Sequence, residues 1–175
     1  SDGCYQDVKQ VLPGCCLFVS GSKIEQKRYW QPDLSPKPFT GTKLQAEEQV
    51  RNLLTESVRL RLRSDVEVGT YLSGGIDSAI VTKLAQNFTD KQIHTFSVAF
   101  ESDEFDESGY QTRLSESLGT QHHVVKVVQD DIARNFPAAL DHCEIPVFRT
   151  AFVPLFMLSN AVHKAGIKVV LTGEG

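Results

Sequence analysis

Long apolar runs and long basic runs are both missing from this sequence of 175 residues. No uninterrupted apolar stretch approaches the about 18 residues that a membrane-spanning helix needs. The first ten residues show no basic region followed by an apolar one, so no secretory signal is visible. Lys and Arg total 18 against 22 Asp and Glu, a formal charge of −4. We therefore expect neither nucleic acid nor a membrane as the main partner.

Cysteine is scarce, and its four positions form no metal-binding pattern. Cys15 and Cys16 are adjacent and would point to opposite faces of a strand, while Cys4 and Cys143 lie apart in the sequence. No CxxC pair and no Cys/His spacing suited to zinc occurs. We expect reduced, structural thiols in a cytoplasmic protein.

The first 43 residues predict a hairpin followed by a linker. Two short strands around a turn at residues 20–22 are predicted between residues 11 and 30, and three prolines then fall within seven residues. Such a proline-rich, polar stretch is typical of a linker. The residues before it are too few for an independent domain. We therefore assign residues 1–31 to the remnant of a truncated domain, 32–43 to a linker and 44–175 to a second domain.

Beyond the linker, short apolar segments alternate with helical patterns. A helix is predicted from a capping box at Thr42 and Gln45 to about Arg63, and a later helix is expected to break near Pro137. The alternation predicts an α/β fold, a parallel sheet with helices on both faces. Ligands of such sheets bind beyond the carboxyl ends of the strands, where the segments SGGIDS and TGEG fall. The predicted strands are 66–72, 93–100, 122–128 and 167–171.

The segment SGGIDS, residues 73–78, is the motif whose residues are suited to binding a ligand. Two consecutive glycines let the backbone approach a bound group closely, and the helix that follows presents free N–H groups to an anion. Ser73 and Ser78 add hydroxyl donors. Asp77 has the wrong charge for a phosphate unless a divalent cation lies between them, and Mg²⁺ is the usual bridge. The motif therefore indicates a site for Mg·ATP, bound through its phosphates.

This segment differs from two common nucleotide-binding loops. No GK[ST] follows, so it is not a Walker A loop, and it does not match GxGxxG. A tight strand-to-helix turn capped by Asp77 is the purely structural alternative. That alternative does not account for SGG and DS together at the end of a strand.

SGGIDS resembles the PP-loop of the ATP pyrophosphatases, whose fold is that of the adenine nucleotide alpha hydrolases. Four flanking segments are similar, in order and spacing, to glutamine-dependent asparagine synthetases: RLRSDVEVGTYLSGGIDSA, HTFSVAF followed by EFDES, LGTQHHVV and GIKVVLTGEG. The stretch LPGCCLFVSGSKIEQKRYW is similar to the last strands of that family's glutaminase domain. A β-lactam or carbapenam synthetase shares the architecture, but Glu174, in GEG, favours asparagine.

The resemblance implies a role for individual residues. Asp77 would bind Mg²⁺, and Glu174 would act as the catalytic residue beside the reacting aspartyl group. Arg149 is a candidate contact to the substrate or phosphates, the alternative being an ordinary surface or helix-start cation. The remaining residues would bind ATP: Ser73, Gly74, Gly75 and Ser78 its pyrophosphate, the backbones of Leu72 and Val98 its adenosine, and Thr172 and Gly173 its ribose and α-phosphate.

The implied reaction is amidation of aspartate to asparagine, with ATP and Mg²⁺ and through a β-aspartyl-AMP intermediate. Glutamine would supply the ammonia through a glutaminase domain that is not present in this chain, and the complete protein could form a homodimer. We expect the chain by itself neither to hydrolyse glutamine nor to make asparagine, because the glutaminase cysteine would lie upstream of Ser1 and further synthetase residues downstream of Gly175. A truncated, non-catalytic nucleotide-binding module is the other hypothesis.

Overall fold

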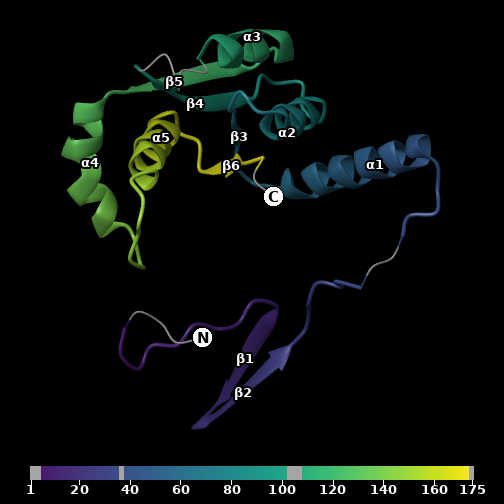
Figure 1. Cartoon of the computed structure of the whole chain (residues 1–175), viewed down its shortest axis with the longest axis vertical. Helices are drawn as coiled ribbons and strands as arrows, with labels where there is room; N and C mark the ends of the chain where they lie inside the picture. The colour runs from purple at the N-terminus through teal and green to yellow at the C-terminus, as the bar shows by residue number, and fades with distance from the viewer. Residues whose placement is uncertain (1–4, 36–37, 102–107, 174–175) are drawn as a thin grey trace. The chain divides into compact units, whose positions relative to one another are not determined.

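The computed structural model describes residues 5–35, 38–101 and 108–173 of the chain (Figure 1). The chain divides into two compact units, Ser1–Gly41 and Thr42–Gly175. Within the described residues, no helix is both long enough and apolar enough to cross a membrane.

The first unit contains a two-stranded antiparallel hairpin, as predicted. Strands β1 (Cys15–Ser20) and β2 (Lys23–Arg28) pair from Cys15 opposite Arg28 to Ser20 opposite Lys23. Gly21 lies in the two-residue turn with a φ of 57°, which glycine adopts without strain. Most of the hairpin's side chains are exposed. A two-stranded hairpin with so little buried surface has marginal stability of its own.

The second unit is built on a four-stranded parallel sheet in the order β5-β4-β3-β6. The predicted strands are all present, with ends that differ by a few residues. Their bounds are β3 Val68–Tyr71, β4 His94–Phe100, β5 Gln121–Val127 and β6 Val169–Leu171.

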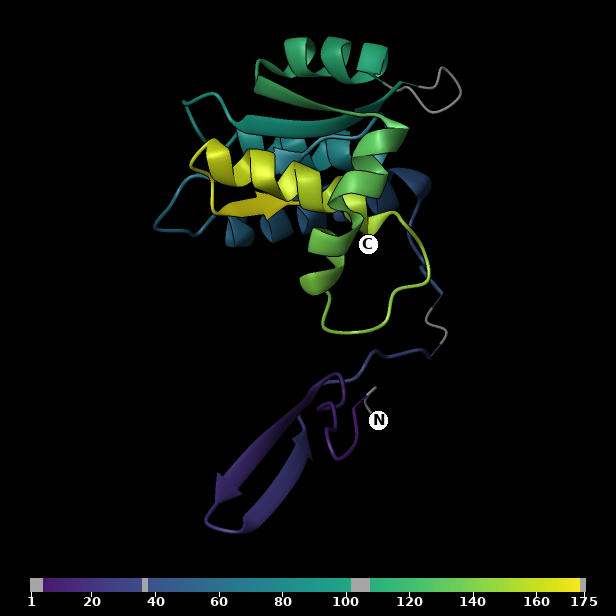
Figure 2. The ribbon, with the colours of Figure 1, turned by 90° about the vertical axis from the view of Figure 1, so that its left-hand side faces the viewer.

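Helices cover both faces of this sheet, which confirms the predicted fold class. Helices α2 and α3 pack on one face and α5 on the other, with α1 beside α2 and α4 beside α5 (Figures 1 and 2). Gly119 and Gly166, just after α3 and α5, take φ values of 68° and 79°, as helix-ending glycines do. The helices are α1 Lys43–Arg61, α2 Ile76–Gln86, α3 Ser108–Leu118, α4 Gln129–Asp141 and α5 Phe152–Lys164.

Each face of the sheet has its own apolar core. A buried hydrogen bond also joins the sheet to α2: the hydroxyls of Thr70 in β3 and Thr82 in α2 lie 2.9 Å apart, and both residues are fully buried. The core beneath α1 and α2 contains Val58, Ala85, Ile93 and Leu171, and that beneath α5 contains Phe96, Leu158, Val162 and Ile167.

Helix α1 begins as predicted and leaves most of its apolar face uncovered. The Thr42 hydroxyl accepts from Gln45 N at 3.3 Å, and Gln45 Oε1 accepts from Thr42 N at 2.8 Å, so the capping box is formed. Of its apolar face, Val58 is buried, whereas Val50 and Leu53 are more than half exposed.

Helix α4 corrects one expectation, because it does not break near Pro137 but continues to Asp141. A proline inside a helix loses one hydrogen bond and crowds the preceding turn. Tertiary contacts offset that cost here. Ala139 is buried beyond the proline, and the ring of Phe136 packs edge-on against Phe152 of α5, with centroids 5.4 Å apart.

The two histidines of β5 lie on opposite faces of the sheet. His122 Nδ1 is 2.9 Å from the hydroxyl of Thr95, while the His123 ring stacks on Phe96 and its Nε2 is 2.9 Å from His94 Nδ1. Burial lowers the pKa of both His122 and His123; the neighbouring charge of His123 lowers that of His122 further, and His94 acts likewise on His123.

These lowered pKa values predict a loss of stability in mild acid. Below the ordinary histidine pKa of about 6.5, the unfolded chain binds protons that the folded chain does not. The free energy of unfolding should therefore fall as the pH drops from about 7.5 to about 5.5, measured by urea denaturation. His122→Gln should flatten this decline, whereas His163→Gln, at an exposed position of α5, is the matched control. An equal decline in the His122 variant would contradict this assignment.

Candidate functional site

The order of the strands creates a crevice between β3 and β6. From β3 the chain moves outward through α2, β4 and α3 to β5, with both helices on one face. It then returns by way of α5 on the opposite face to β6, on the other side of β3. The helix that leaves β3 and the helix that leads into β6 thus lie on opposite faces, and open α/β sheets bind their ligands at the point where the strand order reverses in this way.

The loop that leaves β3 is folded around one hydroxyl group. Ser78 Oγ lies 2.9 Å from Ser73 Oγ and 3.2 Å from Ser73 N, which donates to it. The same oxygen lies 3.0 Å from Gly75 O and 3.2 Å from Ser73 O. Ser78 is buried whereas Ser73 is exposed. Ser78 therefore holds the loop in shape, and Ser73 is the hydroxyl positioned to reach a ligand.

The segment that leaves β6 lies directly against this loop. A Cβ atom on Gly173 would come within 2.7 Å of Asp77 C and Ser78 Cα, in the first turn of α2. No side chain fits at such a distance, so glycine is required for this close approach. The two segments predicted to carry the chemistry therefore meet through their backbones.

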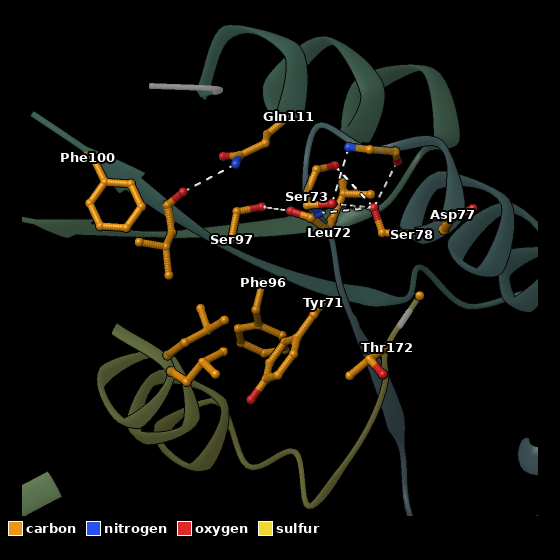
Figure 3. A pocket seen from close by; sticks show the side chains of 15 residues that line it. Tyr71, Leu72, Ser73, Asp77, Ser78, Phe96, Ser97, Phe100, Gln111 and Thr172 are labelled. Carbon is orange, nitrogen blue, oxygen red and sulfur yellow. Dashed lines mark hydrogen bonds between the residues drawn. The ribbon is translucent and has the colours of Figure 1, made fainter. Parts of the chain in front are cut away.

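A cavity of about 550 Å³ opens beyond these strand ends (Figure 3). Its volume lies within the range of small-molecule sites, about 300 to 1,000 Å³. It is lined by residues of β3, β4, α2, α3, α5 and the segment after β6: Tyr71, Leu72, Ser73, Gly75, Asp77, Ser78, Phe96, Ser97, Val98, Phe100, Gln111, Leu155, Leu158, Thr172 and Gly173.

The two ends of the cavity differ in chemistry. Asp77 and Thr172 lie at one end, beside the serine hydroxyls of the loop, and Phe100 lies at the other (Figure 3). The first turn of α2, whose N–H groups have no partner within the helix, faces the polar end. The cavity is thus suited to an elongated ligand with an anionic end and a flat or apolar end.

The edge of β4 offers backbone hydrogen bonds to such a ligand. Leu72 N donates to Phe96 O at 2.9 Å, so the polar backbone groups of Phe96 face β3. Those of Val98, two residues on, face the same side, but β3 has already ended. Ser97 Oγ donates to Leu72 O and fixes the end of β3. Val98 therefore lies where the edge of β4 pairs with no strand, and its carbonyl accepts from Gln111 Nε2 at 3.2 Å.

The structure brings most of the predicted site residues to this cavity and leaves two described ones elsewhere. Gly74 lines a neighbouring depression with Tyr110 and Arg113. Arg149 is exposed in the loop before α5 and is not among the lining residues. Glu174 lies outside the described residues.

Several lining residues give no functional signal in the sequence. Phe96 and Phe100 belong to the apolar alternation of β4, and Leu155 and Leu158 to the apolar face of α5, so their pattern indicates core packing. Gln111 gives no functional signal either, because a glutamine in a helix usually lies on the exposed surface.

Asp77 is the candidate metal ligand, and among the residues that the structure describes no cluster of metal-binding side chains surrounds it. No group of three or more His, Cys, Asp or Glu residues that could hold a metal ion occurs within the described ranges. One carboxylate beside an anion site suits Mg²⁺, which is commonly held by a single carboxylate together with substrate phosphates.

Comparison with known proteins places these features in a family. Residues 49–175 match the family described as asparagine synthase. The chain is 37% identical over 98% of its length to Amidase chyE of Penicillium rubens, covering 28% of that protein. It is 32% identical over 98% of its length to a putative glutamine-hydrolysing asparagine synthetase of Mycobacterium bovis, and 31% identical over 96% to asparagine synthetase 1 of Bacillus subtilis, covering 26% of each.

The fold and site define an α/β domain with a ligand cavity at the switch point of its sheet. The chain belongs to the asparagine synthase family. It spans about a quarter of the length of these relatives. A solved NH3-dependent NAD synthetase from Campylobacter jejuni is similar over 70% of this chain and 54% of its own, with a TM-score of 0.48 and 15% identity.

The close approach of Gly173 predicts a large effect of a single methyl group. Gly173→Ala should lower the free energy of unfolding by about 1–3 kcal/mol, because the added Cβ must push the first turn of α2 away. Gly109→Ala is the matched control, since a Cβ there meets nothing within 4 Å. Urea denaturation measures both. Equal stability of the two variants would contradict the close packing of the two segments.

Proposed function

We propose that this chain carries the ATP-binding part of a ligase that converts aspartate to asparagine. Aspartate would be activated as β-aspartyl-AMP, with release of pyrophosphate, and ammonia would then displace AMP. In the longer protein, glutamine would supply the ammonia through a glutaminase domain.

One observation carries the proposal. The SGGIDS loop and the Thr172–Gly173 segment line one cavity at the switch point of the sheet, in a chain of the asparagine synthase family. An elongated cavity with an anion-binding end, lined in part by the edge of β4, matches the shape and charge of ATP.

The first step forms a bond between an oxygen of the aspartate side chain and the α-phosphorus of ATP. The bond from that phosphorus to the bridging oxygen breaks, and pyrophosphate leaves with the electron pair. The N–H groups of the first turn of α2 and the Ser73 hydroxyl would stabilise its charge. Ser78 would keep these donors in position through its contacts to Ser73 and Gly75.

The second step forms a bond between nitrogen and the activated carbonyl carbon. Ammonia attacks that carbon, AMP leaves with the electron pair, and the nitrogen loses a proton. Apolar side chains such as Leu155 and Phe100 would help keep water from the mixed anhydride. Glu174, which follows Gly173 in the chain, is the proposed catalytic residue, and Arg149 the proposed contact to the substrate.

Asp77 would hold the metal ion that accompanies ATP. When bound, Mg²⁺ would offset the negative charge of the phosphates. The Asp77 carboxylate could then lie next to them without repulsion. Asp77 lies in the first turn of α2 and lines the cavity, so its carboxylate is available to this end of the ligand.

An amidase is the second candidate function, because a relative with that name shares 37% identity with the chain. The two candidates differ in their need for ATP. The ligase produces pyrophosphate only when both ATP and aspartate are present. Hydrolysis of an amide releases ammonia without any nucleotide, so ammonia release in the absence of ATP would favour the amidase.

Replacing Asp77 tests the proposed function most sharply. Asp77→Ala should weaken Mg·ATP binding to this chain at least tenfold, measured by equilibrium dialysis, because the phosphates lose their bridge to the loop. In the native polypeptide the same change should abolish aspartate-dependent release of pyrophosphate while glutamine hydrolysis survives.

Asp90→Ala is the matched control, since Asp90 is an exposed acid that does not line the cavity. It should leave binding and pyrophosphate release unchanged. Unchanged pyrophosphate release by the Asp77 variant would refute the assignment of the loop.

A further inference from the structure

His122 of β5 is linked by hydrogen bonds to the start of the SGGIDS loop, although it is not among the residues that line the cavity. His122 Nε2 lies 3.4 Å from Ser97 Oγ, and Ser97 Oγ donates to Leu72 O, as Figure 3 shows. His122 Nδ1 lies 2.9 Å from the hydroxyl of Thr95. Thr95, Ser97 and Leu72 are buried, so these contacts run through the interior of the sheet.

The Ser97 hydroxyl has a single proton, and this proton sets the direction of the bonds around it. The bond to Leu72 O uses the proton, so Ser97 Oγ can only accept from His122. Nε2 of His122 must therefore carry a proton. With the proton on Nδ1 instead, Nε2 and Ser97 Oγ would be two acceptors that face each other. The ring is thus protonated at Nε2, and Nδ1 accepts from the Thr95 hydroxyl.

The surroundings of His122 keep its ring neutral. Burial lowers the pKa of His122 below the ordinary value of about 6.5, and the charge of His123 lowers it further. A contact with the Thr95 backbone raises this pKa, but it is the smallest of the three effects. A neutral ring is what the two contacts require, because it accepts at one nitrogen and donates at the other.

Leu72 is the point at which β3 ends and the loop begins, and β4 holds both of its backbone polar groups. Leu72 N donates to Phe96 O at 2.9 Å, and Leu72 O accepts from the Ser97 side chain. The next residue, Ser73, carries the hydroxyl that is positioned to reach a ligand. The position of this hydroxyl therefore depends on how firmly Ser97 holds Leu72. The bond from His122 restrains Ser97 in turn.

We propose that His122 is a positioning residue for the phosphate-binding loop. Its Nε2–H group holds the Ser97 hydroxyl, and that hydroxyl holds the carbonyl of Leu72 from which the loop starts. His122 itself touches no ligand in this arrangement. The inference rests on the proposed function, since it assumes that the loop binds the phosphates of Mg·ATP.

The location of the proton on His122 is the first test, and it needs no nucleotide. In the chain labelled with ¹⁵N-histidine, at a pH of about 7.5, the ring should give the nitrogen shifts of a neutral imidazole protonated at Nε2. His122→Gln, which lacks these signals, assigns them. A ring protonated mainly at Nδ1 overturns the inference, since such a ring has no donor for Ser97.

Two amide variants separate this role from a merely structural one. The amide nitrogen of glutamine can occupy the place of a histidine Nε2, whereas the shorter asparagine reaches only the place of Nδ1. His122→Asn should therefore weaken Mg·ATP binding about tenfold, measured by equilibrium dialysis, because the loop loses its fixed start. His122→Gln should bind within about twofold of the unmodified chain, because it keeps a donor for Ser97. His163→Asn, at an exposed position of α5, is the matched control and should bind normally.

A double variant tests whether His122 acts through Ser97. In a Ser97→Ala chain the acceptor is gone, so adding His122→Asn should cost no further affinity for Mg·ATP. A second loss of about tenfold in this background would show that His122 acts by another route, and it overturns the inference.

The outcomes distinguish this inference from the proposed function. Equal Mg·ATP affinities of His122→Asn and His122→Gln overturn the inference, since the donor at Nε2 would then have no role. Binding that still depends on Asp77 leaves the proposed function standing in that case. If His122→Asn does not fold, the location of the proton and the affinity of His122→Gln decide. Failure of the unmodified chain to bind Mg·ATP overturns the proposed function and this inference together.

Discussion

The approach of the Gly173 backbone to the first turn of α2 is the contact on which the rest of the site depends. Pairing of β6 with β3 brings the ends of the two strands side by side, and the absence of a side chain at Gly173 lets the segments touch. The start of α2 is thereby held between two strand ends. Gly173, Asp77 and Ser78 all line the cavity, so the contact lies at its edge, where the order of the strands reverses.

The two serines of the SGGIDS loop have different roles. Ser78 is buried, and its oxygen is engaged with the backbone and side chain of the same loop, so it maintains the shape of the loop. Ser73 is exposed toward the cavity. A loop that is held in its binding shape before the ligand arrives avoids part of the entropy cost of ordering it.

Local chemistry in the sequence predicted the fold well. The capping box at Thr42 acts through neighbouring residues, so a short stretch of sequence is enough to place the start of α1. The SGGIDS loop and the TGEG segment were predicted at strand ends because alternating strands and helices fix the direction of a parallel sheet.

Features that depend on distant contacts were missed or misjudged. Helix α4 continues through Pro137 because contacts with α5 offset the free-energy cost of a proline inside a helix. The residues next to Pro137 in the sequence do not reveal those contacts. Gln111 has the sequence pattern of a surface residue. It is buried because α3 packs on β4, and that contact between distant segments is not visible in the local sequence. The exposure of Val50 and Leu53 on α1 likewise depends on tertiary packing, which the residues of one helix do not specify.

Hydrogen–deuterium exchange with and without Mg·ATP tests the central claim most directly. If phosphates bind where β3 and β6 end, peptides that contain residues 72–78, 97–100 and 171–173 should exchange more slowly when the nucleotide is added. The hairpin, residues 15–28, should exchange at the same rate in both conditions. Protection that is absent from these three segments, or that is confined to other parts of the chain, would contradict the account.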